Sequence, residues 1–293
     1  MAMVMVIERT VTMQKNDYWD SVIEPRSSWL SINLRELYNY KDLVALFVRR
    51  DFVSQYKQTL LGPIWFFIQP VFTTLIFTVI FGRVAGIATD GIPHPIFYMS
   101  GIVIWNYFAD CLTKSSETFQ LNQTLFGKVY FPRLIVPLSV IVSNLIKLGV
   151  QLILLFGFIL YYIFNGHQLL NAYLVLFPFY IIIIAFLGLG LGLIISSMTT
   201  KYRDLRFLIQ FGVQLAMYAT PIVYPLSIIS ESNRFWILLN PVSSVVEGFR
   251  FSLFGSGFIS LEWTLYSLIV SIIVLFLGVV VFNRVERSFI DTI

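Results

Sequence analysis

The sequence predicts an all-α integral membrane protein with six transmembrane helices. Of its 293 residues, 57% are hydrophobic and 12% are charged, and the mean hydropathy is +0.80, which excludes an ordinary soluble globular domain. A bilayer core about 30 Å thick needs about 20 apolar residues per helix, and backbone amides in lipid must be hydrogen-bonded within their own segment. The expected spans, which form one domain over residues 62–284, are 62–83, 95–119, 134–164, 169–198, 207–226 and 262–283.

The distribution of arginine and lysine predicts the orientation of these spans. Fifteen of these residues fall before the first span, after the last span or in every second connecting segment, against three on the opposite side. Cytoplasmic segments of membrane proteins carry such an excess, so the tails 1–32 and 285–293 are both expected in the cytoplasm. Residues 1–7 lack the basic start of a cleavable signal peptide. The net charge of +4 then reflects topology and contact with anionic membrane lipid, and no nucleic acid is expected as a partner.

Residues 33–61 predict an N-terminal amphipathic helix at the cytoplasmic interface. Asn33 and Glu36 have the spacing of a capping box, and Gly62 with Pro63 marks the end of the helix. An apolar stripe repeats every four residues, at Val44, Val48, Phe52 and Tyr56. The helix carries too many charges to span a bilayer, so we expect it in the membrane plane. A surface helix packed on its own protein is the alternative.

Four charged residues fall inside the predicted spans. Asp110, Lys114 and Glu117 share one face of the second span, and Lys147 lies in the third. Charges at this depth are costly and usually face protein or water. We expect a structural ion pair near the cytoplasmic side, either Glu117–Lys147 or Asp110–Lys114. A proton or ion relay is the alternative.

The fourth span contains glycines at alternating positions. Gly188 and Gly192 have the GxxxG spacing, which favours a close approach between two helices. The sequence therefore predicts tight packing here, either inside one bundle or between two subunits.

Residues 226–257 predict a re-entrant helical hairpin at the outer face, before the last span. The apolar runs on the two sides of Asn240-Pro241 are too short to cross a core of about 30 Å, and a proline disfavours helix at the residue before it. Glu247 and Arg250 are spaced i, i+3, so they can neutralise each other near the interface. An ordinary extracellular loop is the alternative.

The sequence predicts no catalytic residue, cofactor or metal site. It contains no GxxxxGK[ST] phosphate loop, so the chain itself is not expected to hydrolyse ATP. Residues 16–20 read NDxxD, a motif that binds Mg²⁺–diphosphate in membrane prenyltransferases, but no second aspartate-rich motif accompanies it. His94 and His167 fall near the outer ends of spans and are expected to be interfacial residues. The single Cys111 lies inside a span and supports neither a disulfide nor a thiolate metal cluster.

Aromatic residues, which form 17% of the chain, suggest a path for sugars. An aromatic face can stack on the apolar face of a sugar ring. The candidates for a substrate path are Trp65 and Phe66 in the first span and Tyr218 and Tyr224 in the fifth. Interfacial anchoring or ordinary helix packing is the alternative for each of them.

Seven short segments, taken together, resemble the ABC-2-type polysaccharide permeases. In order, they are Arg49-Arg50-Asp51-Phe52, Tyr56-Lys57-Gln58-Thr59-Leu60-Leu61-Gly62, Lys128-Val129-Tyr130-Phe131-Pro132-Arg133, Lys201-Tyr202-Arg203-Asp204, Pro221-Ile222-Val223-Tyr224-Pro225, Asn240-Pro241 and Glu247-Gly248-Phe249-Arg250. The ordered set covers about residues 35–285 and is most similar to the O-antigen (lipopolysaccharide) export permeases. Teichoic-acid export permeases are relatives.

The resemblance implies a homodimer with an ABC-2 (type V exporter-like) fold that carries two separate ABC ATPase subunits. These partners, not this chain, would bind ATP and Mg²⁺. The cargo implied is a lipid-linked polysaccharide, moved from the cytoplasm across the inner (plasma) membrane. The residues implied in coupling to the ATPase are Arg49, Arg50, Asp51, Lys128, Tyr130, Phe131, Pro132, Arg133, Tyr202, Arg203 and Asp204. Those implied in an outer gate are Pro221, Pro225, Asn240, Pro241, Glu247 and Arg250.

Two alternatives to O-antigen export stay open. The cargo could be teichoic acid or capsular polysaccharide, carried by a permease of the same kind. The chain could instead be an ion-coupled secondary transporter that uses the charges inside its spans. Such a transporter needs no ATPase and usually shows an internal repeat, of which the sequence gives no clear sign.

Overall fold

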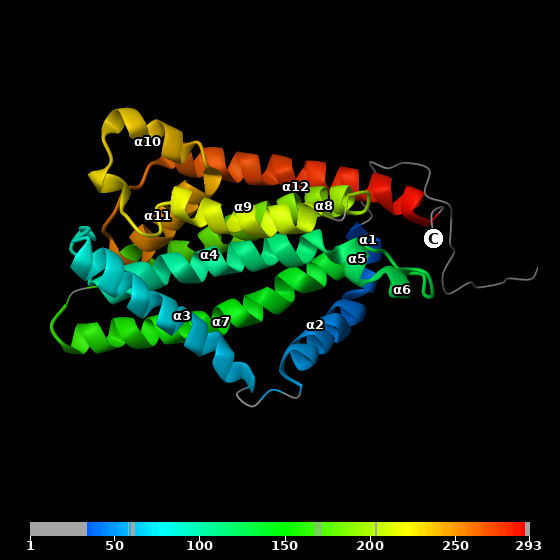
Figure 1. Ribbon diagram of the computed structural model, residues 1–293, viewed down its shortest axis with the longest axis horizontal. Helices are drawn as coiled ribbons and strands as arrows, with labels where there is room; N and C mark the ends of the chain where they lie inside the picture. Colours follow the sequence, from blue (N-terminus) through cyan, green and yellow to red (C-terminus); the bar gives the residue numbers. More distant parts are fainter. Residues whose placement is uncertain are drawn as a thin grey trace, which may run out of the picture. The chain divides into compact units, whose positions relative to one another are not determined.

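The computed structural model describes residues 34–57, 59, 62–167, 169, 171–202 and 204–290, and the regular structure in these ranges is helical (Figure 1). This confirms the predicted all-α class for the described residues. The predicted tail 1–32, Asn33, the NDxxD motif and Arg203 lie outside them. The helices are α1 (Leu34–Asn39), α2 (Lys41–Tyr56), η1 (Gly62–Ile64), α3 (Trp65–Phe77), η2 (Thr78–Val84), α4 (His94–Ser116), α5 (Thr118–Leu121), α6 (Gln123–Phe126), α7 (Ile135–Phe164), η3 (Ala172–Leu176), α8 (Phe177–Thr199), α9 (Leu205–Ala219), η4 (Leu226–Ile228), α10 (Glu231–Leu238), α11 (Pro241–Phe254) and α12 (Leu261–Ile290).

Within the described ranges, four helical segments are long and apolar enough to cross a membrane. They are Trp65–Val84, Ile135–Phe164, Ala172–Thr199 and Leu261–Glu286. They correspond to the first, third, fourth and sixth predicted spans. The last helix continues to Ile290, so the predicted tail 285–293 begins inside a helix and not after it.

The second and fifth predicted spans correspond to α4 and α9, which differ from the other four. α4 is 23 residues long and carries Asp110 and Lys114. α9 has 15 residues, which at 1.5 Å per residue gives only about 22 Å of helix. It ends at Ala219 because Thr220 precedes Pro221 and is extended, with φ −100° and ψ 144°. The predicted span 207–226 is therefore too long at its C-terminal side.

The helix α4 forms the core of the bundle. Sixteen of its 23 residues are buried, and it packs against α8, α7, α3 and α11. Because protein surrounds α4 on most sides, it can carry polar side chains that a lipid-facing helix could not. Ser100, Ser115 and Ser116 are buried in it.

Glycines on α8 bring three helices together. A Cβ atom at Gly192 would lie 2.6 Å from the Cβ atom of Ser115 on α4, and one at Gly190 would lie 2.6 Å from the backbone nitrogen of Leu275 on α12. In turn, a Cβ atom at Gly278 of α12 would lie 2.5 Å from the backbone oxygen of Gly190. The close packing predicted from the GxxxG spacing is therefore confirmed, and here it occurs within one chain.

The charges inside the spans pair differently from the prediction. Lys147 Nζ lies 2.7 Å from Asp110 Oδ2, Lys114 donates to Asn144 Oδ1 at 2.9 Å, and Glu117 pairs with Arg206 of α9. The predicted pairs Glu117–Lys147 and Asp110–Lys114 are both wrong. Since α4 and α7 run in opposite directions, a step toward the C-terminal end of α4 corresponds to a step back toward the N-terminal end of α7, which takes Glu117 out of reach of Lys147.

The predicted interface helix is divided into α1 and α2. The break falls at Tyr40, and α2 ends at Tyr56, before the predicted end at residue 61. α2 packs on α7. Phe47, which lies beside the predicted stripe, is buried, and its ring meets that of Phe131 edge-on at 5.7 Å.

The break predicted at Asn240-Pro241 is confirmed, with α10 before it and α11 after it. The Asn240 side chain accepts a hydrogen bond from the backbone N–H of Val242 at 3.1 Å, which caps α11. Gly255 ends α11 in the left-handed conformation, at φ +69°. Twelve of the 14 residues of α11 are buried. α10 and α11 lie at one end of the long helices, and α2, α5 and α6 lie toward the other (Figure 1).

Candidate coupling, path and gate residues

The segment after α6, residues 127–134, contacts α2 through Phe131. Phe131 packs between Phe47 of α2 and Phe126 of α6, with ring centroids 5.7 and 5.8 Å away. Phe131 and Pro132 are buried, whereas Lys128 and Tyr130 are exposed. The two buried residues therefore hold the segment in place, and the two exposed residues are available to a partner.

Arg133 is a structural contact and not an exposed docking residue. Only 6% of it is exposed, and it donates to the backbone oxygen of Glu286 on α12 at 3.0 Å, with the Glu286 carboxylate 3.9 Å away. Its guanidinium also lies 5.1 Å from the centre of the Phe126 ring. Burial lowers the pKa of Arg133, and the nearby Glu286 charge opposes that shift. Sequence reasoning missed this role because the partner is 153 positions away.

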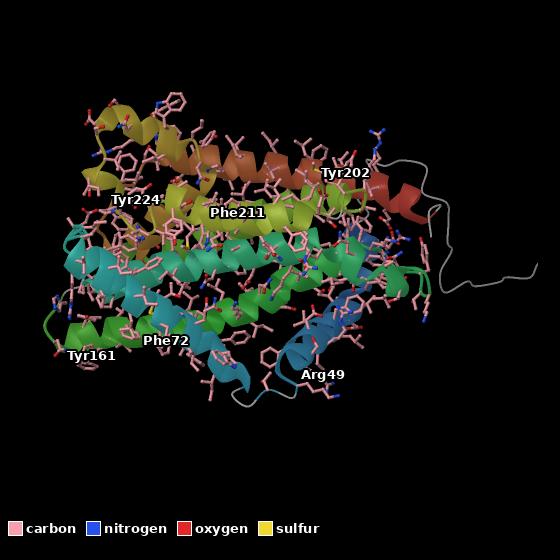
Figure 2. The ribbon with its side chains drawn as sticks, viewed as in Figure 1. Arg49, Phe72, Tyr161, Tyr202, Phe211 and Tyr224 are labelled. Carbon is pink, nitrogen blue, oxygen red and sulfur yellow. The ribbon has the colours of Figure 1, made fainter. Side chains whose placement is uncertain are left out.

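The other predicted coupling residues lie on the surface. Arg49 and Arg50 are exposed on α2, and Arg50 pairs with the neighbouring Asp51 at 2.8 Å. Tyr202 and Asp204 are exposed in the turn between α8 and α9, and Arg203 lies outside the described residues. Figure 2 shows Arg49 and Tyr202 on different elements, away from the end that carries Tyr224.

The four predicted path residues do not form one cluster. Trp65 and Phe66 begin α3, whereas Tyr218 lies at the end of α9 and Tyr224 follows it. Trp65 and Tyr218 are exposed, Phe66 is buried, and Tyr224 packs partly against the core. Phe66 has a local structural role, because Lys147 Nζ lies 5.8 Å from its ring centre.

An exposed stripe on α9 was not predicted. None of the 15 residues of α9 is buried, and its exposed large side chains include Phe207, at 73%, and Phe211. The stripe is formed by Phe207, Leu208, Phe211, Leu215 and Tyr218. Figure 2 shows Phe211 projecting from α9. Spacings of four residues between Phe207, Phe211 and Leu215 were the sequence signal that could have identified it.

Two of the predicted gate residues, Glu247 and Arg250, form a buried ion pair. Arg250 Nη1 lies 3.1 Å from Glu247 Oε1, and each side chain is 1% exposed. Arg250 also donates to the backbone oxygens of Pro221, at 2.5 Å, and Ile222, at 2.7 Å. Its guanidinium lies 3.8 Å from the centre of the Phe97 ring of α4. One arginine thus connects α11, the turn after α9 and the central helix.

Asn240 reinforces the same junction. Its Nδ2 donates to Thr220 Oγ1 at 3.1 Å while its Oδ1 caps α11. Glu247 Oε2 accepts a weak hydrogen bond from the backbone N–H of Phe258 at 3.3 Å. Pro241 is the first residue of α11, and Pro225 precedes η4. The structure therefore brings Pro221, Asn240, Glu247 and Arg250 to one junction, and Pro225 borders it in sequence.

Comparison with known proteins gives a consistent result. The ABC-2 type transporter family matches residues 42–254. Two similar proteins are named O-antigen export system permease protein RfbA. The one from Myxococcus xanthus is 28% identical over 265 residues, which cover 89% of this chain and 98% of the relative. The one from Klebsiella pneumoniae is 26% identical over 251 residues, covering 85% and 94%.

A third relative has a different name. The polysialic acid transport protein KpsM of Escherichia coli is 24% identical over 254 residues, which cover 85% of this chain and 95% of the relative. The family match covers more than half of the chain and spans α2 to α11. The matched range includes the segment 127–134, the α9 stripe and the buried Glu247–Arg250 junction. This chain is a member of the ABC-2 type transporter family.

Proposed function

We propose that this chain is the transmembrane permease subunit of an ATP-driven exporter of lipid-linked polysaccharide. One observation carries the proposal. The chain belongs to the ABC-2 type transporter family and aligns with 94% and 98% of two proteins named O-antigen export system permease. Such nearly complete alignment makes the whole architecture comparable, not a single domain.

The topology proposed has six spans, with α4 and α9 as the second and the fifth, and both termini in the cytoplasm. Two observations support it. α4 buries 16 of its 23 residues, so the polar groups of this helix can cross the membrane inside protein. α9 is short, but its exposed side chains are mostly apolar. The pair α10 and α11 would be the re-entrant hairpin at the outer face, and α2 the amphipathic helix at the cytoplasmic interface.

The cargo path proposed lies between two copies of this chain. A polymer cannot be enclosed in a pocket inside one bundle, and a symmetric pair offers a continuous route along its axis. The α9 stripe is compatible with this proposal, because a span with none of its residues buried within one chain can face either lipid or a second copy. Its aromatic rings, with Trp65, would let sugars slide by stacking.

Two ABC ATPase subunits would supply the energy and bind ATP and Mg²⁺. The exposed Lys128 and Tyr130 in the segment 127–134, with Tyr202 and Asp204 between α8 and α9, are suited to contact them. Because Phe131 and Arg133 join this segment to α2 and α12, a push on its surface would be transmitted to both helices.

Export of a capsular polysaccharide is the second candidate. It is favoured by the similarity to a protein named for polysialic acid transport. An ion-coupled mechanism is less favoured, because Asp110 and Lys147 neutralise each other at 2.7 Å.

The proposed function is tested by reconstitution. The purified chain, with and without the ATPase subunit that copurifies with it, is placed in vesicles loaded with lipid-linked polysaccharide. We expect transport only when both proteins and ATP are present. Transport by the chain alone, or driven by an ion gradient without ATP, would contradict the proposal.

A further inference from the structure

A polar cavity of about 610 Å³ lies between α2, the start of α3, α4, α5 and α7. Five charged side chains line it, Arg50, Lys114 and Lys147 against Asp51 and Glu117. Part of the wall is apolar, formed by Phe66, Val136 and Val140 among others. The cavity is therefore amphiphilic, with charged groups and an apolar wall lining one partly open space.

The charges in this cavity do not balance. Arg50 is paired with Asp51, Lys147 with Asp110, and Glu117 with Arg206, so each of these four lining residues has a partner of opposite sign. Lys114 does not. Within the described part of the chain, its ammonium group contacts a neutral amide, Asn144 Oδ1 at 2.9 Å, and no carboxylate. One positive charge is left without a counter-charge in a partly buried position.

A second polar group that lines this cavity has no hydrogen-bond partner in the described ranges. The hydroxyl oxygen of Ser143, which lines the cavity on α7, is buried without a hydrogen-bond partner among the described residues. Buried polar groups are normally satisfied, and each exception calls for an explanation. An ammonium group has three donor hydrogens, and Lys114 uses one of them on Asn144. The cavity thus offers free donors and a positive charge to a ligand that supplies acceptors and a negative charge.

We propose that this cavity binds the phosphate-bearing head of a lipid, at the end of the cargo where the lipid and the polysaccharide are joined. The inference rests on the proposed function. A phosphate on a lipid satisfies both properties of the cavity, because its oxygens accept from Lys114 and Ser143 and its apolar chain can lie along Phe66, Val136 and Val140. A neutral sugar would leave the charge of Lys114 uncompensated.

The position of the cavity agrees with this role. It adjoins α2, the proposed interface helix, and the cytoplasmic half of α7, where a lipid from the inner leaflet would arrive. Arg50 and Lys147 are held by their own partners, so they can add attraction without being required for binding. Lys114 is thus the residue on which phosphate binding depends.

The experiment measures binding to the purified full-length chain in a neutral detergent. The probe is farnesyl diphosphate, with farnesol as the uncharged analogue and phosphatidylglycerol as an ordinary phospholipid. We expect Lys114→Gln to weaken binding of farnesyl diphosphate about tenfold or more, since a charged hydrogen bond is lost. Ser143→Ala should weaken it about threefold. Lys114→Arg, which keeps the charge, should bind nearly as the native chain does.

Lys41→Gln is the matched control, because Lys41 is an exposed lysine on α2 that does not line this cavity. Binding equal to that of the native chain is expected, and an unchanged melting temperature in all variants establishes that they fold. The inference is overturned if Lys114→Gln binds like the native chain, or if farnesol binds as tightly as the diphosphate. It is also overturned if phosphatidylglycerol displaces the diphosphate at equal concentration, since the cavity would then hold an ordinary phospholipid.

Export in cells separates this inference from the function on which it rests. We expect the native chain and Lys41→Gln to export polysaccharide, and Lys114→Gln to leave lipid-linked polysaccharide in the cytoplasmic leaflet. If Lys114→Gln exports as the native chain does, the phosphate site is refuted and the proposed function stands. If the native chain exports no polysaccharide with its ATPase, the proposed function itself is refuted.

Discussion

Arg250 and Glu247 form an ion pair that is almost completely enclosed by the protein, with 3.1 Å between Nη1 and Oε1 and 1% of each side chain exposed. Such a pair is costly to desolvate and contributes little net stability compared with apolar residues, but removing one partner leaves a buried charge. Here the arginine also bonds two backbone oxygens of the turn after α9. The pair is therefore best understood as a fixed junction between α11 and that turn.

Replacing Arg250 should strongly destabilise the protein. We expect Arg250→Met to lower the free energy of unfolding by about 3–5 kcal/mol, because it leaves the buried Glu247 carboxylate without its counter-charge and two backbone oxygens without their donor. The melting temperature in detergent measures this loss. Arg83→Met, at an exposed arginine, should change stability by less than about 0.5 kcal/mol. Equal melting temperatures for the two variants would show that the junction is not a stabilising contact.

Two glycines in helices should respond in opposite ways to alanine. At Gly190 a Cβ atom would meet the α12 backbone at 2.6 Å, whereas at Gly149 it would meet no atom within 4 Å. We expect Gly190→Ala to destabilise the fold by about 1–3 kcal/mol through overpacking. Gly149→Ala should be neutral or stabilise it by up to about 1 kcal/mol, from the better helix propensity of alanine. Thermal unfolding of the two variants side by side decides the matter, and a stabilising Gly190→Ala would contradict the close packing.

The ion pair between Asp110 of α4 and Lys147 of α7 predicts that a second substitution restores part of the stability lost by the first. Asp110→Asn and Lys147→Gln each leave one partly buried charge unpaired, so each should destabilise the protein by about 1–3 kcal/mol. The double variant removes both charges and should be less destabilised than the sum of the two single variants. A double-mutant cycle of melting temperatures measures the coupling. Strict additivity would mean that the two side chains do not interact.

Substitutions at Lys128 and Arg133 should have different effects, although both residues lie in the segment 127–134. The first should impair coupling of ATP hydrolysis to export, and the second should impair folding. Lys128→Glu changes an exposed side chain, so we expect a normal melting temperature and ATP hydrolysis that no longer drives export. Arg133→Glu would place a negative charge beside Glu286, 3.9 Å from the present nitrogen, and should lower the yield of folded protein. A folded Arg133→Glu variant with normal stability would contradict the structural role of Arg133.

The α9 stripe should matter for transport and not for the stability of one chain. Phe211→Ala removes an exposed ring, so the stability of the detergent-solubilised monomer should change by less than about 0.5 kcal/mol. Export and self-association should both decrease, if a second copy covers this face. Tyr161→Ala, at another exposed aromatic residue, on α7, is the control and should affect neither. Normal export by Phe211→Ala would argue against a path along α9.

Local sequence signals predicted the helical class and several boundaries. The break at Asn240-Pro241 follows from proline chemistry, and the contacts of α8 follow from its glycine spacing. The length of α9 was misjudged although Pro221 carried the necessary signal. The pairing of Asp110 with Lys147 could not be predicted, since it depends on the register between two antiparallel helices.

The functional candidates divide in the same way. For exposed residues such as Lys128, contact with the ATPase, which the motif implied, stays a prediction. Arg133, in the same motif, has a contact with α12 that only the three-dimensional arrangement reveals. The four path candidates were chosen by residue type, and type alone does not determine where a ring lies.

The seam of glycines on α8 has a mechanical consequence. Where backbones meet without intervening side chains, as at Gly190 and Gly278, there is no flexible layer in which one helix could slide past another. α4, α8 and α12 are therefore expected to move together as one rigid unit. Conformational change during transport is then expected in segments outside this unit. α9 is the first candidate for such movement, because none of its residues is buried.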